Sequence, residues 1–157
     1  MTGKDRLDKI DRSLLNSLQR DNRIPLDRLA RKLRIPKSTI HYRIRRLEKA
    51  GIIKGYGARL DAAQLGHDYL GIVAVRVTSG PQGAERIGKR LAEVNGAWAV
   101  YYVLGDIDFI VVIRAHDRDD YMRKLNEIFN VGDIERTTTH IVARVFKDPI
   151  LDPTVPL

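Results

Sequence analysis

The stretch that decides the fold of the first domain is residues 26–52, LDRLARKLRIPKSTIHYRIRRLEKAGI. Apolar residues recur in it at steps of three and four, over a short run before Pro36 and a longer run after it. This spacing predicts two helices joined by a tight turn. Because the second helix carries a basic outer face, the pair is typical of a helix-turn-helix that binds double-stranded DNA.

A third helix is predicted just before this pair. Leu7, Ile10, Leu14, Leu15 and Leu18 form one apolar stripe over residues 8–20, with Asp8 or Asp5 as a candidate N-cap. Three short stripes of this kind can share one small core.

The longer helix separates an apolar face from a face of hydrogen-bond donors. At roughly 100° per residue, Ile40, Ile44 and Leu47 cluster on the inner side. We predict that the rest of the helix contacts DNA through Lys37, Ser38, Thr39, His41, Tyr42, Arg45, Arg46 and Lys49. Arg45 suits guanine, and Arg46 and Lys49 suit phosphates. The plain alternative is a solvated basic surface.

Residues 52–60 have the pattern of a strand, a glycine turn and a second strand. They predict a wing, from which Lys54 or Arg59 would reach the sugar-phosphate backbone.

The charge distribution supports a DNA partner for the first domain alone. Residues 1–59 hold 17 lysines and arginines against 6 acidic residues, a net charge of +11, whereas residues 60–157 hold 11 against 14, a net charge of −3. A concentrated positive field attracts a polyanion and gains from counterion release.

Composition excludes several other classes. The chain has no cysteine, which removes disulfides and thiolate chemistry, and its start lacks the apolar core of a secretion signal. The longest apolar runs, such as residues 109–113, have the length of a strand and not of a membrane span. A soluble cytoplasmic protein without membrane partners is predicted.

The second half of the chain changes to a βαββαβ order. Strands are predicted over residues 69–78, 97–104, 107–115 and 134–147, and helices over residues 81–94 and 117–129. The fold class is therefore α+β, a winged helix-turn-helix followed by a ferredoxin-like domain. The predicted boundaries are 1–60 for the first domain, 61–68 for a linker, 69–148 for the second domain and 149–157 for a proline-rich tail, which either packs on a neighbouring subunit or stays mobile.

Both helices of such a unit cover one face of the sheet, so the other face should be polar. The central strands are instead apolar on both faces, as in Trp98–Leu104 and residues 109–113. Since the chain supplies no third layer, we predict that a second copy covers the sheet in a homodimer. A dimer would also present two recognition helices to two half-sites roughly 34 to 36 Å apart.

Two polar groups in the second domain are ambiguous from their residues alone. Asp106 and Asp108 follow Gly105 in the link between the central strands, where they suit either a β-turn or a binding site. Thr137 and Thr139 suit either strand formation or ligand contact. Together the carboxylates and hydroxyls match the ammonium and carboxylate of an amino acid.

An enzyme is the main alternative from another class. The four histidines, His41, His67, His116 and His140, fall in separate elements without metal-ligand spacing. Asp106 and Asp108 have no nucleophile or oxyanion donor near them in the sequence. We therefore expect no catalysis, no cofactor and no metal.

The whole chain from residue 7 to 147 resembles the Lrp/AsnC, or feast/famine, family of transcriptional regulators. The matching stretches are residues 7–11, 21–23, 29–30, 43–53, 55–56, 65–66, 105–108 and 137–142. The resemblance implies an amino-acid-sensing second domain, dimers that assemble further to tetramers or octamers, and an effector bound near Gly105, Asp106 and Asp108, with Thr137 and Thr139 beside it. The chain departs from many relatives at Pro25 and Pro36, where a Ser or Thr would cap the helix.

The alternative within DNA binding is an architectural protein with little sequence specificity. Such a protein needs only the basic domain and oligomerisation. Steep losses of affinity when a few bases of a half-site change would distinguish a sequence-specific regulator from it.

Overall fold

The computed structural model describes residues 7–148 and residue 155. The chain divides into two compact units, one made of residues 1–60 and 147–157 and the other of residues 61–146. The polypeptide therefore passes from one unit to the other twice.

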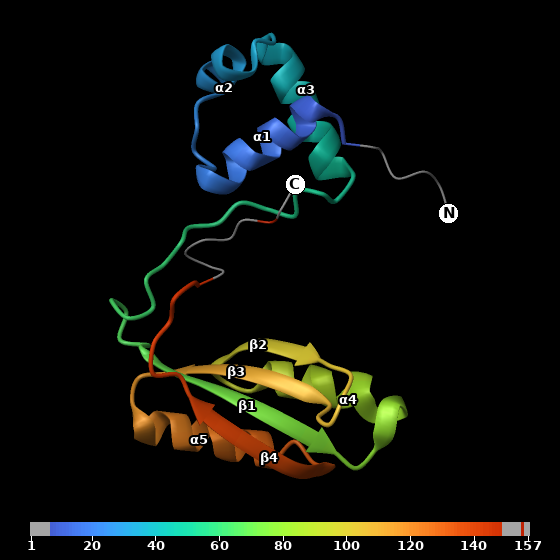
Figure 1. Ribbon diagram of the computed structural model, residues 1–157, viewed down its shortest axis with the longest axis vertical. Coiled ribbons are helices and arrows are strands. Elements are labelled where there is room, and N and C mark those ends of the chain that lie inside the picture. The colour runs from blue at the N-terminus through green and yellow to red at the C-terminus, as the bar shows by residue number, and fades with distance from the viewer. Residues whose placement is uncertain (1–6, 149–154, 156–157) are drawn as a thin grey trace. The chain divides into compact units, whose positions relative to one another are not determined.

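The first unit is a three-helix domain with the predicted helices (Figure 1). They are α1 (Lys9–Arg20), α2 (Leu26–Leu33) and α3 (Lys37–Lys49). The buried core consists of Leu14, Leu15, Leu29, Ile40 and Leu47, which come from all three apolar stripes. The helix-turn-helix and its shared core are thus confirmed.

The helix starts follow from the residues before them. Asp8 caps α1 as predicted, and its carboxylate accepts from the backbone N–H of Asp11 at 2.7 Å while Asp11 accepts from that of Asp8 at 3.2 Å. This reciprocal arrangement is a capping box, which ties two otherwise unpaired donors. Pro25 and Pro36 occupy the N-cap positions of α2 and α3 without side-chain caps.

The two strands predicted over residues 52–60 are not formed in this structure. A hairpin needs hydrogen bonds between its two arms, and this segment bonds instead to the end of α1. The side chain of Asn22 donates to the carbonyl of Gly57 at 2.9 Å, and Arg59 donates to the carbonyls of Gln19 and Arg20. The segment between α3 and the second unit is irregular (Figure 1).

The second unit is the predicted ferredoxin-like domain. It contains β1 (Tyr69–Val77), α4 (Gly80–Glu93), β2 (Ala97–Tyr102), β3 (Phe109–Ala115), α5 (Arg118–Phe129) and β4 (Ile134–Ile141). The four strands form one antiparallel sheet in the order β2-β3-β1-β4. Both helices lie on one face of it (Figure 1), where Val73, Val75, Val111 and Ile113 are buried with Ile87, Leu91 and Ile128.

β4 ends at Ile141, six residues before the predicted end. Its partner β1 begins at Tyr69, and the last bond between them joins the N–H of Val142 to the carbonyl of Leu70 at 2.9 Å. Residues 142–148 form no strand beyond that bond, although β1 itself extends back to Tyr69 in its pairing with β3. The predicted tail, residues 149–157, lies outside the described residues except for Val155.

The other face of the sheet carries no helix and is largely apolar, as predicted. Leu70, Ile72 and Ala74 of β1 lie beside Ile110 and Val112 of β3 in the antiparallel register. Ile72 is 36% exposed, and Tyr101 of β2, which pairs with Ile110, is 56% exposed. We call this surface the open face.

One glycine on the covered face is required by its neighbour. A Cβ on Gly71 would lie 2.3 Å from the hydroxyl oxygen of Tyr121 on α5, and the ring carbons are almost as near. Tyr121 is only 1% exposed, so its ring has no space to move away. Gly71 lets α5 pack its tyrosine directly on the backbone of β1.

Within the described part of the chain, no helix is both long and apolar enough to cross a membrane.

Candidate nucleic-acid interface and ligand site

The outer face of α3 presents most of the predicted DNA-contacting side chains to solvent. Ile40 and Leu47 are buried on the inner side, and Tyr42 on the outer side is 67% exposed. The exposed members of the set are Lys37, Ser38, His41, Tyr42, Arg45 and Lys49. These side chains offer donors of several types along one helix, as a base-reading element requires.

Thr39 and Arg46, in contrast, are half-buried at the flank of α3. Nη2 of Arg46 donates to Oδ2 of Asp11 at 2.5 Å. A guanidinium has five N–H donors, so this contact does not exhaust it. Arg46 is therefore bonded to α1, and its contact with a phosphate stays a prediction.

Asp11, whose carboxylate is buried, joins α1 to α3 through an ionic cluster whose other members are partly exposed. It is 1% exposed and also accepts from Nη1 of Arg43 at 2.8 Å, while Arg43 reaches Asp8 at 2.6 Å. The backbone N–H of Asp11 and then the Arg43 guanidinium lower the pKa of Asp8 below its ordinary value, and the two carboxylates raise that of Arg43. The cluster therefore ties α3 to the start of α1.

The cluster was not predicted from the sequence, although a signal was present. Asp8 and Asp11 are three residues apart at a helix start, a spacing that suits a capping pair. Their basic partner, Arg43, lies 32 residues beyond Asp11, where helical periodicity gives no information about contact.

Two other ion pairs on α3 are exposed and weak. Lys37 pairs with Asp27 at 3.0 Å, and Arg45 approaches Glu48 at 3.8 Å. Exposed pairs contribute about 0 to 1 kcal/mol, so DNA phosphates and bases can displace them. Glu48 also accepts from the hydroxyl of Tyr56 at 3.0 Å, and burial together with this contact raises the pKa of Tyr56.

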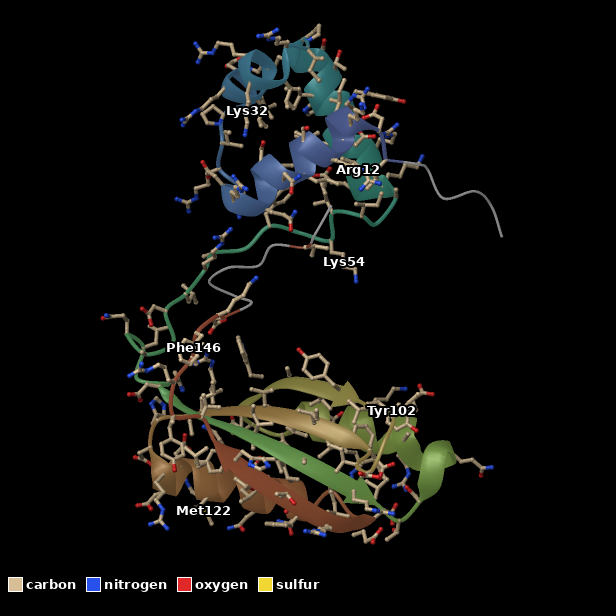
Figure 2. All side chains as sticks on the ribbon, in the orientation of Figure 1. Arg12, Lys32, Lys54, Tyr102, Met122 and Phe146 are labelled. Carbon is tan, nitrogen blue, oxygen red and sulfur yellow. The ribbon has the colours of Figure 1, made fainter. Side chains whose placement is uncertain are left out.

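Lys54, the remaining predicted DNA contact, is exposed on the irregular segment after α3 (Figure 2). It does not sit on a wing strand, since that strand is absent.

The link between β2 and β3 brings its two aspartates to one end of the sheet. Gly105 has a φ of +144°, and Asp106 is exposed. Asp108 is half-buried, and its Oδ2 accepts from the backbone N–H of Val77 at 2.9 Å. Asp108 therefore has a structural role at the end of β1, in addition to any role in binding a ligand.

Thr137 and Thr139 lie on β4, on the other side of β1. Thr137 pairs with Val75, whose carbonyl accepts from the N–H of Asp108 at 2.9 Å. Both threonines share the register of buried Val73 and Val75, so they point to the face that the helices cover. Thr137 is thus one strand away from Asp108, and Thr139 is about 7 Å further along the sheet.

Arg76 adds a positive charge to this end of the sheet that the sequence did not single out. Its Nη1 donates to the carbonyl of Asp106 at 3.4 Å, and its Nε lies 3.3 Å from a carboxylate oxygen of Glu135. Carboxylates and a guanidinium beside one another can address both charged ends of a zwitterion.

The structure brings together two of the histidines that fall in separate elements. The ring centroids of His67 and His116 are 4.0 Å apart, and Nδ1 of His116 is 2.7 Å from the carbonyl of Gly66. Among the described residues, no group of three or more histidine or acidic side chains is arranged to hold a metal ion.

Fold and site together define a class of protein, a transcriptional regulator with a helix-turn-helix followed by a ligand-binding domain. Residues 7–54 match a family model described as winged helix-turn-helix DNA-binding, and residues 71–150 match that of the Lrp/AsnC ligand binding domain. The chain belongs to the Lrp/AsnC family of DNA-binding transcriptional regulators, as the sequence resemblance predicts. It is a regulator by family, not an enzyme.

Relatives from archaea and bacteria extend over most of the chain. The chain is 32% identical to the HTH-type transcriptional regulator FL11 of Pyrococcus horikoshii over 142 residues, which is 90% of this chain and 93% of that protein. It is 33% identical to the proline dehydrogenase transcriptional activator of Rhodobacter capsulatus over 124 residues, covering 78% and 80% of the two chains. A feast or famine regulatory protein from M. tuberculosis, solved in complex with L-methionine, is similar with a TM-score of 0.81 and 29% identity, covering 90% of this chain and 95% of that one.

Proposed function

We propose that this regulator recognises specific DNA sequences with the outer face of α3 and that an amino acid bound to its second unit modulates that recognition. The observation that carries the first part is the row of exposed donors on a helix that Arg43 and Arg46 join to buried Asp11 of α1. We expect the protein to act in the cytoplasm, beside its DNA.

Arg45 and Lys49 are expected to contribute to DNA binding in different ways. Arg45→Ala removes a side chain suited to guanine, so affinity for a selected operator should fall by about 1 to 3 kcal/mol while affinity for scrambled DNA changes little. Lys49→Ala removes a phosphate contact, so both affinities should fall alike. The slope of log affinity against log salt concentration should become shallower by about 1. Fluorescence anisotropy over a salt series measures both quantities.

Arg118, an exposed arginine of α5 in the second unit, supplies the control substitution, Arg118→Ala. If Arg45→Ala weakens operator and scrambled DNA equally, α3 does not read bases, and the architectural alternative is favoured.

For the effector, we propose an amino acid whose ammonium is held by Asp106 and Asp108 near Gly105, with Thr137 and Thr139 as further contacts. Support comes from the placement of the aspartates at one end of the sheet, from Arg76 beside Asp106, and from the L-methionine bound to the similar M. tuberculosis protein. Linkage then requires that the amino acid bind more tightly to one DNA-binding or assembly state than to another.

Asp106→Asn is expected to weaken amino-acid binding about tenfold or more, because a hydrogen bond to a charged group contributes roughly 1.5 to 3 kcal/mol. Isothermal calorimetry with a panel of amino acids on the wild type identifies the ligand first. Asp106 is a better target than Asp108, whose replacement also removes the acceptor for the N–H of Val77. DNA affinity without amino acid should remain at the wild-type value.

The exposed Asp68 of the same unit provides the matched variant, Asp68→Asn, which should bind the amino acid normally. An unchanged affinity in Asp106→Asn would remove this residue from the proposed site.

We further propose that the open face is covered by a second copy of the chain in a homodimer, and that dimers assemble into tetramers or octamers. A contiguous apolar surface on a sheet is costly in water, and its own unit provides helices only on the opposite side. A two-fold dimer would pair two recognition helices on two half-sites.

A further inference from the structure

A groove in the first unit shares only Lys54 and Arg59 with the contacts predicted for DNA. Its volume is about 970 Å³, and it lies between the end of α1 and the irregular segment after α3. Its walls combine apolar with cationic side chains, among them Leu15, Leu18, Ile52, Arg20, Arg23 and Lys54. Such a surface suits a ligand that is both apolar and acidic.

Val155, from the C-terminal part of the chain, already lies at this groove. Its N–H donates to Oε1 of Gln19 at 2.6 Å, and its carbonyl accepts from Nε2 of the same side chain at 3.4 Å. Val155 is 65% exposed as a residue, and its two hydrogen bonds to Gln19 are made by its backbone. A planar carboxamide offers a donor beside an acceptor, which matches the N–H and C=O of one extended residue.

The sequence around Val155 favours that backbone shape. Pro156 follows it, and a residue before proline is restricted to extended conformations. Pro149 and Pro153 further limit the conformations that the free segment can adopt, which lowers the entropy lost when it docks.

The composition of the segment also complements the groove. Residues 148–157 contain two aspartates, no lysine or arginine, and several aliphatic residues, namely Ile150, Leu151, Val155 and Leu157. The groove wall carries Arg20, Arg23 and Lys54 beside its leucines and isoleucine. Charge and hydrophobicity therefore both favour the chain's own C-terminal segment as the occupant.

We infer that this groove is a peptide-binding site of the DNA-binding unit and that residues 148–157 of the same chain occupy it, held through the Gln19 carboxamide. The segment follows β4 of the ligand-binding unit, so docking makes a second physical connection between the units besides the one after residue 60. This connection goes beyond the proposed function and does not depend on DNA or amino-acid binding.

The test uses hydrogen exchange of the full chain, measured by mass spectrometry without DNA or amino acid. Val155→Pro removes the N–H that donates to Oε1 of Gln19. Gln19→Ala removes the carboxamide that makes both hydrogen bonds with Val155. Each change should accelerate exchange in peptides covering residues 15–23 and 52–59 roughly tenfold, as expected for the loss of one or two hydrogen bonds. Val155→Thr keeps the backbone groups and should exchange like the wild type, as should Gln82→Ala, at an exposed glutamine of α4.

Wild-type exchange in both Val155→Pro and Gln19→Ala would overturn the inference, as would equal acceleration in Val155→Thr, because recognition would then not be through the backbone.

Cross-linking decides which chain supplies the segment. The protein has no native cysteine, so Arg20→Cys at the groove wall with Val155→Cys, which leaves the Gln19 carboxamide in place, presents only two thiols to a short bismaleimide. A link within one chain, detected by mass, supports the inference, with single-cysteine Val155→Cys as the control. A covalent dimer specific to the double variant would assign the groove to the tail of a second copy, and no link at all would leave it without this occupant; either result contradicts the inference.

Discussion

Asp11→Ala is expected to unfold the DNA-binding unit at temperatures where the wild type is folded. The carboxylate is 1% exposed and accepts from Arg43, from Arg46 and from the N–H of Asp8, so its removal leaves Arg43 with Asp8 alone, takes the carboxylate partner from half-buried Arg46 and opens the capping box. Loss of hydrogen bonds to charged groups costs about 1.5 to 3 kcal/mol. That is a large part of the stability of a small domain.

The measurement can separate the two units. The single tryptophan, Trp98, lies in the ligand-binding unit, so its fluorescence reports unfolding there, whereas the far-ultraviolet helix signal reports both units. We expect part of the helix signal to be lost at lower temperature, before the fluorescence transition. Asp27→Ala, which breaks only the exposed pair with Lys37, should cost no more than about 0.5 kcal/mol. Equal stability of the two variants would refute a structural role for the cluster.

Ile72→Asp is expected to convert the proposed homodimer into monomers at micromolar concentration. Ile72 is at the centre of the open face and 36% exposed, so the single protomer can keep an aspartate hydrated, but a dimer would bury it without a partner. The penalty of about 3 kcal/mol or more for each buried charge should weaken association more than a hundredfold. Sedimentation equilibrium measures the dissociation constant directly.

The control is Met122→Asp, which places the same charge on an exposed apolar residue of α5 (Figure 2). α5 covers the opposite face of the sheet, so this variant should remain dimeric. Affinity for an operator with two half-sites should fall for Ile72→Asp alone, because a monomer loses the second recognition helix. A wild-type protein that sediments as a monomer, or an Ile72→Asp protein that remains dimeric, would exclude the open face as the interface.

The helices and strands that have a clear hydrophobic periodicity were predicted from the sequence. The stripe of Leu14 and Leu15 on α1, the buried Ile40 and Leu47 of α3, and the alternating strands of the second unit all appear as expected, since burial of one face imposes a fixed spacing. The apolar open face was also predicted, because the central strands carry apolar residues at consecutive positions and therefore on both faces.

Features that depend on distant partners were not predictable in the same way. Residues 52–60 have strand-like composition, but a strand needs a neighbour, and Asn22 and Arg59 direct this segment to α1 instead. β4 ends at its pair with Gly71 of β1, which the composition of β4 alone does not reveal. The placement of Thr137 on the covered face follows only from its register with Val75.

The proposed ligand site contains residues that the sequence indicated and residues that it did not. Asp106 and Asp108 were found because two carboxylates follow a glycine in a short link, whereas Arg76 was overlooked because an arginine in an otherwise apolar strand is not unusual. The bond from the Val77 N–H to Asp108 depends on how β1 and β3 meet. The sequence shows which residues can bind a ligand. Whether such a residue also supports the fold, as Asp108 does, is seen only in the structure.

The contact of Tyr121 with Gly71 constrains how this domain can diverge among relatives. A methyl group at position 71 demands the space that the phenol ring holds, and the ring in turn is useful only above a residue without a side chain. A side chain at position 71 is therefore compatible only with a smaller residue at position 121. Two positions fifty residues apart in the sequence are coupled through this single contact.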